Sequence, residues 1–176
     1  MVAGLLLVGM MVMPVVQAAH PLLNGKPPLV ALQGDDGGRL DGSRWSSGEL
    51  VAKVWVVMYV DPDAHTVNSH VEAFLDKAGL PRDQVGSVGI INMQASIMPR
   101  FLMDPILAYK QQEYPDAVYV QDHTKRLVKA WRLADDDYNV MVFDRQGVLV
   151  FHHAGYMEQP QLDAALAAIR QALKRR

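Results

Sequence analysis

Two carboxylates and an imidazole stand close together near the middle of the chain. Asp61, Asp63 and His65 lie within five residues, and His70 follows five residues later. Oxygen and nitrogen donors of this kind can hold a divalent cation. A local interpretation is simpler, because Asp61 before Pro62 is a good helix N-cap and Asp63 is a first-turn acid, each stabilising a helix start by about 0.5–1 kcal/mol. We favour the caps, and expect zinc or copper to find no tight site at these residues.

Histidines and methionines supply the other candidate ligands. His152 and His153 are neighbours in a predicted strand, so their side chains point to opposite faces and at most one of them can join a site. Met93, Met98 and Met103 form a loose cluster of thioethers. Such a cluster can be an adaptable binding surface or a copper(I) site, but we favour core filling. The residue pattern therefore assigns no catalytic, cofactor-binding or metal-binding residue.

The composition excludes several chemistries. The 176 residues contain no cysteine, so this sequence has no nucleophile for thiol–disulfide exchange or cysteine-based peroxide reduction. The formal net charge of −2 leaves no general electrostatic footprint for nucleic acid. Glycine-rich phosphate loops, nucleophile elbows and HExxH zinc motifs are also absent from the sequence.

The first 19 residues have the pattern of a cleavable signal peptide. They carry no charged side chain, and an apolar run over residues 5–13 is followed by Pro14 and small residues. The run is shorter than the ~20 apolar residues of a membrane span. We expect cleavage after Ala18 or Ala19, which leaves His20 near the new N-terminus, export to the periplasm and no stable membrane insertion. Because no basic residue precedes the run, an upstream start codon and an uncleaved anchor stay open as alternatives.

The elements that must position these residues follow from the apolar pattern. Residues 51–60 are almost continuously apolar and β-branched, which predicts a central strand buried on both faces. Asp61 and Pro62 then predict the start of a long helix that Gly79 and Pro81 end. The next predicted elements are a strand over 88–93, a helix opened by Asp104 and Pro105, a strand over 117–120 and a short helix around 127–131.

The last third predicts a hairpin and a closing helix. Strands over 138–143 and 148–152 flank a turn in which Gly147 can supply a positive φ. The final helix starts near Pro160 and has an apolar stripe at positions 162, 166, 169 and 173. The order β-α-β-α-β-α-β-β-α predicts one α/β domain over residues 20–176, a mixed central sheet with helices on both faces and a C-terminal β-hairpin plus helix.

This order carries a family resemblance. Together with the segments YPDAVYVQDHTKRLVKAW and YNVMVFDRQGVLVFHHAGYMEQPQLDAALAAI, it resembles the thioredoxin-like superfamily in its redoxin and peroxiredoxin branch. Within that branch, NGKPPLV and WSSGELVAKVWVVMYV are similar to the YtfJ family, small bacterial periplasmic proteins without an assigned biochemical function. The resemblance implies a thioredoxin-like fold and a periplasmic location, and its motifs determine fold more than activity.

The resemblance also locates a degenerate redox site. In catalytic superfamily members the reactive cysteine lies where the first long strand passes into the first long helix, whose N–H groups stabilise a thiolate. A cis-proline before the penultimate strand lies beside that cysteine. The matching positions here are Asp61, Pro62, Asp63, Ala64 and His65 and, at the cis-proline, Tyr138. Both halves of the redox site are therefore replaced.

These expectations favour a non-catalytic binding or scaffold protein of the periplasm. Its partner is unknown, and another periplasmic protein is one candidate. The loops over 61–66, 92–104 and 134–138 should converge at the carboxyl ends of the central strands, where open α/β sheets usually bind ligands. Two alternatives stay open: a metal-dependent enzyme or metal-binding protein that uses the same rim, and an accessory protein that recognises redox partners without exchanging electrons.

Overall fold

A mixed β-sheet forms the centre of the molecule. The computed structural model describes residues 19–96 and 100–175, and within them the main sheet has six strands in the order β2-β6-β5-β4-β7-β8. Strands β4, β5 and β6 are parallel, whereas β2, β7 and β8 each run antiparallel to their neighbours. The strand bounds are β2 Gly37–Arg39, β4 Val54–Val60, β5 Val85–Asn92, β6 Val118–Asp122, β7 Tyr138–Phe143 and β8 Leu149–Ala154. A separate ribbon pairs β1 (Ala31–Leu32) with β3 (Trp45–Ser46).

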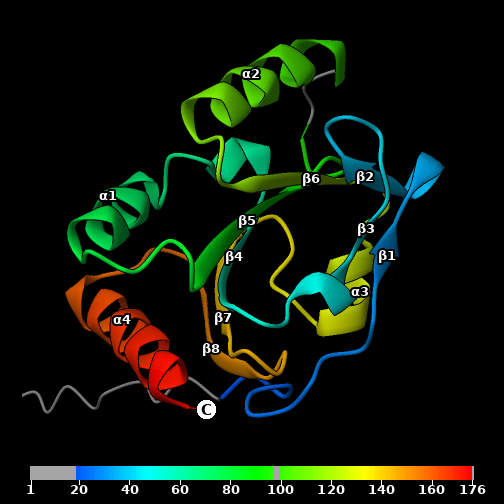
Figure 1. The fold of residues 1–176 in the computed structure, drawn as a ribbon. Coiled ribbons are helices and arrows are strands. Elements are labelled where there is room, and N and C mark those ends of the chain that lie inside the picture. The colour runs from blue at the N-terminus through cyan, green and yellow to red at the C-terminus, as the bar shows by residue number, and fades with distance from the viewer. Residues whose placement is uncertain (1–18, 97–99, 176) are drawn as a thin grey trace, which may run out of the picture.

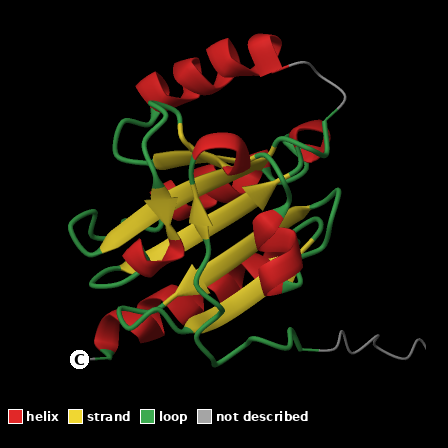
Figure 2. Cartoon of the chain, turned by 90° about the vertical axis from the view of Figure 1, so that its right-hand side faces the viewer, coloured by secondary structure: helices red, strands yellow, loops and turns green. Residues whose placement is uncertain are grey.

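Helices cover both faces of this sheet. Helices α1 (Ser69–Lys77), α2 (Arg100–Glu113) and α4 (Gln159–Lys174) lie over one face, which we call the groove face. Helix α3 (Arg126–Trp131) and the N-terminal segment with β1 and β3 lie over the other (Figure 1). Figure 2, turned by 90°, shows the strands as one twisted layer with α2 at one end of it and the C-terminal helix at the other. In the part of the chain that is described, no helix is both long enough and apolar enough to cross a bilayer.

Alternation along β4 divides the core into two layers. Val56 and Met58 point to the groove face, where they pack with Val71 of α1 and Ile169 of α4. The residues that alternate with them, Val57 and Tyr59, point to the opposite face, toward α3 and the N-terminal ribbon. Both faces of β4 are thus buried, as its continuous apolar run predicted.

The predicted fold class is confirmed. The α/β order, the mixed sheet and the C-terminal hairpin plus helix all occur in the structure. In the hairpin turn Gly147 has a φ of 77° and donates its N–H to the carbonyl of Asp144. The stripe of α4 differs in detail, because its buried positions are Leu162, Ala165, Ile169 and Ala172 and the predicted positions 166 and 173 are only partly buried.

The helix predicted to start at Asp61 does not form as one element. Asp61 is an N-cap, but of a 3-10 helix that spans only Pro62–Ala64, and α1 begins later, at Ser69. The interruption has a tertiary cause at Asn68, which is fully buried and non-helical. Its Nδ2 donates to the carbonyl of Gly155 at 2.8 Å, and its Oδ1 accepts from the N–H of Met157 at 2.9 Å. The side chain holds the loop between β8 and α4 instead of capping its own helix.

The predicted cap at Asp104 and Pro105 is also wrong. Helix α2 already begins at Arg100, so Pro105 lies inside it and removes one N–H donor from the helix. Met103 and Leu107, one turn apart, are buried under α2 against Tyr119. Burying this apolar pair accounts for the earlier start. Met93 and Met103 therefore fill the core as predicted, whereas Met98 lies outside the described residues.

Candidate functional site

The three predicted rim loops do converge at the carboxyl ends of the parallel strands. Hydrogen bonds tie them together in pairs, since Ser96 Oγ donates to Asp63 Oδ1 at 3.3 Å and Asn92 Nδ2 donates to Asp135 Oδ1 at 3.1 Å. A backbone bond of 3.1 Å joins the N–H of Asp61 to the carbonyl of Asp137. The rim is thus a connected surface built from loops that lie far apart in the sequence.

Tyr138 lies directly beside the end of β4. It pairs with Val60 in the antiparallel register and is only 4% exposed. Its hydroxyl donates to the sulfur of Met58 at 3.2 Å, and burial raises the pKa of this phenol. No cis peptide bond occurs within residues 19–96 and 100–175. The position that matches the superfamily's cis-proline is therefore filled by a neutral, buried aromatic ring in a trans chain.

The acidic and histidine residues of the former redox site do not form a metal centre. Asp61 is buried and accepts the N–H of Asp63 at 2.8 Å, which is its capping bond. Exposed His65 donates Nδ1–H to the carbonyl of Pro62 at 2.6 Å. His70 turns away and donates to the carbonyl of Met157 at 2.8 Å. Among the described residues, no three His, Asp or Glu side chains come close enough to hold a metal ion.

The helix-dipole interpretation of Asp61 and Asp63 needs a correction. A three-residue 3-10 helix lacks the aligned peptide dipoles of a long helix, and α1 starts five residues after Ala64. The two carboxylates therefore stabilise a local turn and do not occupy the positive pole of α1. Ala64 and Pro62 belong to the same turn, and both are partly exposed.

A cluster of charged side chains lies at the rim, on the face of the sheet opposite to the groove face. Nζ of Lys125 lies 2.8 Å from Asp135 and 3.1 Å from Asp136. Burial alone would raise the pKa of Asp135, but the hydrogen bonds from Lys125, Asp136 N–H and Asn92 hold it below its ordinary value. Asn92 is almost fully buried, and its Oδ1 has no hydrogen-bond partner among the described residues. This cluster fixes the third loop in place.

A large groove begins at this rim and runs between α1 and α2. Helix α1 packs on α4, and α2 packs on β6, and residues of both helices line the groove over β5. The groove has a volume of about 970 Å³ and reaches from Pro62, His65 and Tyr138 at the rim to Arg82 at the far end. The groove therefore runs from positions that the resemblance matches to a redox site to the amino-terminal end of β5.

Small residues on β5 make the floor of the groove. Met58, Gly89 and Tyr119 stand side by side across β4, β5 and β6, so the middle of this row has no side chain. A Cβ atom on Gly89 would lie 3.1 Å from the ring of Tyr119. Ser87, two residues away on the same face, is exposed, and it comes just before Val88, the first residue of β5 that pairs with β6. The groove is therefore open to solvent at the amino-terminal end of β5.

Sequence reasoning missed this groove. The strand was predicted only from Val88, whereas β5 begins at Val85 and includes Gly86 and Ser87. The available signal was the run VGSVG, because two glycines and a serine leave little to bury in a central strand.

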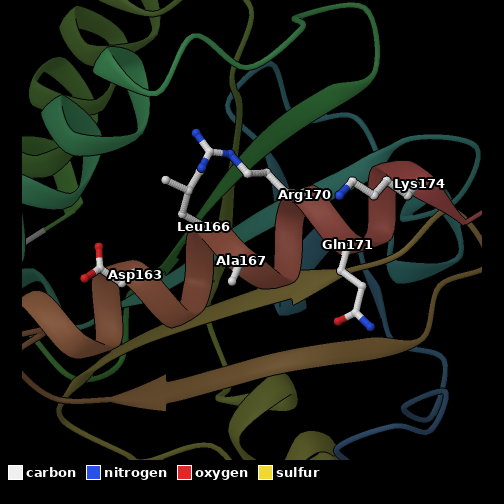
Figure 3. A pocket seen from close by; sticks show the side chains of 6 residues that line it. All are labelled: Asp163, Leu166, Ala167, Arg170, Gln171 and Lys174. Carbon is white, nitrogen blue, oxygen red and sulfur yellow. The ribbon is translucent and has the colours of Figure 1, made fainter.

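A second, smaller depression does not have the features of a site. Its six lining side chains all come from α4: Asp163, Leu166, Ala167, Arg170, Gln171 and Lys174. Figure 3 shows them along the outer side of this one helix, with no second element facing them. A ligand there would meet a convex surface.

Comparison with known proteins identifies the family. Residues 33–172 match the family model described as "Bacterial protein of unknown function (YtfJ_HI0045)". The chain belongs to this family. It is also 22% identical over 173 residues to the uncharacterized protein YtfJ of Escherichia coli (strain K12), with 93% of this chain and 94% of that protein covered.

Solved structures confirm the thioredoxin-like fold of this YtfJ family member. A putative protein disulfide isomerase from Bacteroides thetaiotaomicron has a TM-score of 0.63 at 16% identity, covering 87% of this chain and 91% of that one. The exposed lipoprotein thioredoxin Etrx1 of Streptococcus pneumoniae has a TM-score of 0.59 at 15% identity, covering 82% and 99%. The reduced 2-Cys peroxiredoxin of Plasmodium vivax has a TM-score of 0.58 at 12% identity, covering 88% and 99%. At these identities the likeness concerns the fold alone.

Proposed function

We propose that this YtfJ family member is an exported, non-redox binding protein that holds an apolar segment of a partner protein in the groove between α1 and α2. The observation that carries the proposal is the groove itself, which has Met58, Gly89 and Tyr119 on its floor and the exposed Ile106 of α2 at its lip. Ile106 is 53% exposed, and leaving apolar surface of this kind in water is unfavourable by about 25 cal/mol per Å². An occupant of the groove that covers Ile106 would recover part of that free energy.

The exposed apolar side chains of α2 favour a protein partner over a small molecule. Ile106 lines the groove and is itself exposed, and Phe101 and Tyr109 continue the apolar surface over the outer side of α2 at 72% and 67% exposure. A small ligand in the groove would leave this stripe in water. A polypeptide that enters the groove and crosses its lip would cover both the groove and the apolar stripe of α2. Exposed apolar patches of this kind usually mark interfaces with other proteins.

The charge of the groove selects the chemistry of the partner. Five carboxylates and three basic side chains line it: Glu72, Asp76, Asp83, Glu113 and Asp116, against Lys53, Arg82 and Lys110. The excess of acids favours an apolar segment flanked by lysine or arginine, because opposite charges at the rim steer the encounter and fix the register.

Absence of thiol chemistry is consistent with this role. The sequence has no cysteine, and the Tyr138 phenol at the rim is a weak nucleophile because it is buried, donates to Met58 and has a raised pKa. The rim positions of the former redox site then serve as one end of the binding groove.

Site-specific photo-crosslinking tests the proposal. A photoreactive phenylalanine analogue at Ile106 in the full-length, exported protein should capture one predominant partner, whereas the same analogue at Ala167 on the outer side of α4 should not. Mass spectrometry should place the adduct in an apolar segment with a basic flank, and Ser87→Trp should abolish it. Equal capture at both positions, an adduct insensitive to Ser87→Trp, or labelling of small molecules alone would refute the proposal.

A further inference from the structure

A pair of histidines lies on the face of the sheet opposite to the groove, where the N-terminal segment crosses β8. The ring centres of His20 and His152 are 4.2 Å apart, with the rings tilted by 46°. Two imidazoles bound in adjacent positions of one metal, through bonds of about 2.0 Å, place their ring centres about 4–5 Å apart. The observed separation lies within this range.

The tautomer of His152 follows from its neighbour. The amide of Asn139 is oriented by Ala134, which accepts from Nδ2 at 2.9 Å and donates to Oδ1 at 3.1 Å. Oδ1 of Asn139 can only accept, so the 3.2 Å contact with Nε2 of His152 requires an Nε2–H donor. The lone pair of His152 is therefore on Nδ1. A second ring nitrogen held by a hydrogen bond is the usual support of a metal-binding histidine.

His20 has the same tautomer. Its Nε2 lies 3.3 Å from the carbonyl of Arg132, which can only accept, so the lone pair is on Nδ1. Nδ1 accepts a 3.3 Å bond from the N–H of Leu22, a weak contact that a metal would displace.

We propose that the amino-terminal nitrogen of the mature protein, Nδ1 of His20 and Nδ1 of His152 form a Cu(II) site that exists only after the signal peptide is removed. The described residues contain no three-residue group of His, Asp or Glu for a metal, and in this proposal the backbone amine supplies the third donor. The proposal rests on the cleavage after Ala18 or Ala19 expected from the sequence, and it is independent of the groove.

Either cleavage position provides the chelate. If His20 is the first residue, its α-amine and Nδ1 bind one ion together. If Ala19 is first, the α-amine, the deprotonated amide nitrogen of His20 and Nδ1 bind it. Pro21 has no N–H, so backbone coordination cannot continue beyond His20 and a position stays open for His152. Nitrogen donors in a planar arrangement favour Cu(II) over the other common divalent ions.

The test uses mature protein purified after export, with its N-terminus read by mass spectrometry. Cu(II) titration should give one ion per chain, and electron paramagnetic resonance should show nitrogen coordination that changes in His152→Gln. Glutamine keeps an N–H donor for Asn139 but lacks the imidazole lone pair, so His152→Gln should weaken binding at least tenfold. His153→Gln is the matched control, because His153 points to the opposite face and bonds the carbonyl of Tyr156.

A second variant tests the backbone donor. Mature protein that retains a Gly-Ser-Gly extension before Ala19 should lose the tight site although both histidines are present. The proposal is overturned if His152→Gln binds Cu(II) as tightly as the wild type, if the extended protein does so, or if the mature chain begins too far from His20 for chelation.

Discussion

The carboxylate of Glu72 on α1 and the ammonium of Lys110 on α2 face each other across the groove, with Oε2 and Nζ 3.9 Å apart. Both side chains are partly exposed, so the pair should contribute only about 0.2–1 kcal/mol to folding. Its position gives it a second effect, because Glu72 adds to the acidic rim whereas Lys110 opposes it.

The two halves of this ion pair should therefore affect partner capture in opposite directions. Glu72→Gln should reduce crosslinking from Ile106 and Lys110→Met should increase it, while urea denaturation shows both free energies of unfolding within about 1 kcal/mol of wild type. If both variants change capture in the same direction, the bridge between the helices matters and the charge of the rim does not.

Filling the groove should separate binding from folding. Ser87→Trp places a large ring on the exposed floor, and aromatic residues are well tolerated in strands, so the free energy of unfolding should change by less than about 1 kcal/mol. Capture from Ile106 should fall at least tenfold. Gln171→Trp, on the exposed side of α4, is the control and should leave capture unchanged. Retained capture in Ser87→Trp would show that the partner binds elsewhere.

Asn68 should be among the most sensitive positions for stability. Asn68→Ala removes both bonds to the loop between β8 and α4 and leaves the carbonyl of Gly155 and the N–H of Met157 without their partner. Unsatisfied buried groups cost about 1–3 kcal/mol each, so we expect a loss of about 2–4 kcal/mol in urea denaturation and faster amide exchange at Met157. Ser69→Ala, at the exposed neighbouring position, should have little effect. A loss of similar size in Ser69→Ala would mean that the start of α1, and not the loop, is what Asn68 stabilises.

His152 should make stability depend on pH in a defined window. Its pKa is lowered to about 4 in the folded state, against about 6.5 when unfolded, so the unfolded chain binds the extra proton first as the pH falls. The resulting stabilisation, of the order of 3 kcal/mol at most, is present above pH 6.5 and is lost as the pH falls from 6.5 to 4.

Urea denaturation of the metal-free protein between pH 4 and 7 measures how steeply the free energy of unfolding changes with pH. His152→Gln should flatten it, while His153→Gln serves as the neighbouring control. An unchanged slope in His152→Gln would assign the pH dependence to other groups.

Much of the fold could be predicted because the determining signals are local. The apolar run that became β4, the glycine turn before β8 and the apolar stripe of α4 all specify their own elements through side-chain periodicity. The degenerate redox positions could also be located, since resemblance places Asp61 and Tyr138 at two loops that the topology brings together. The pairing of Val60 with Tyr138 shows that proximity directly.

Other features depended on distant contacts that no local pattern contains. The break before α1 comes from Asn68 bonding a loop 87 residues away, and the early start of α2 comes from burial of Met103 and Leu107 on Tyr119. Propensity rules place a cap or a proline correctly only when no tertiary contact outweighs them.

By itself the sequence determined that this chain has a thioredoxin-like frame and no thiol, because both follow from residue type and order. Only the tertiary structure decided where a surface is left open. Ser87 and Gly89 could have lain under a helix, and His20 could have lain far from His152. Whether α1 and α2 close over β5, and which N-terminal residue reaches β8, is set by packing between elements that are distant in the chain.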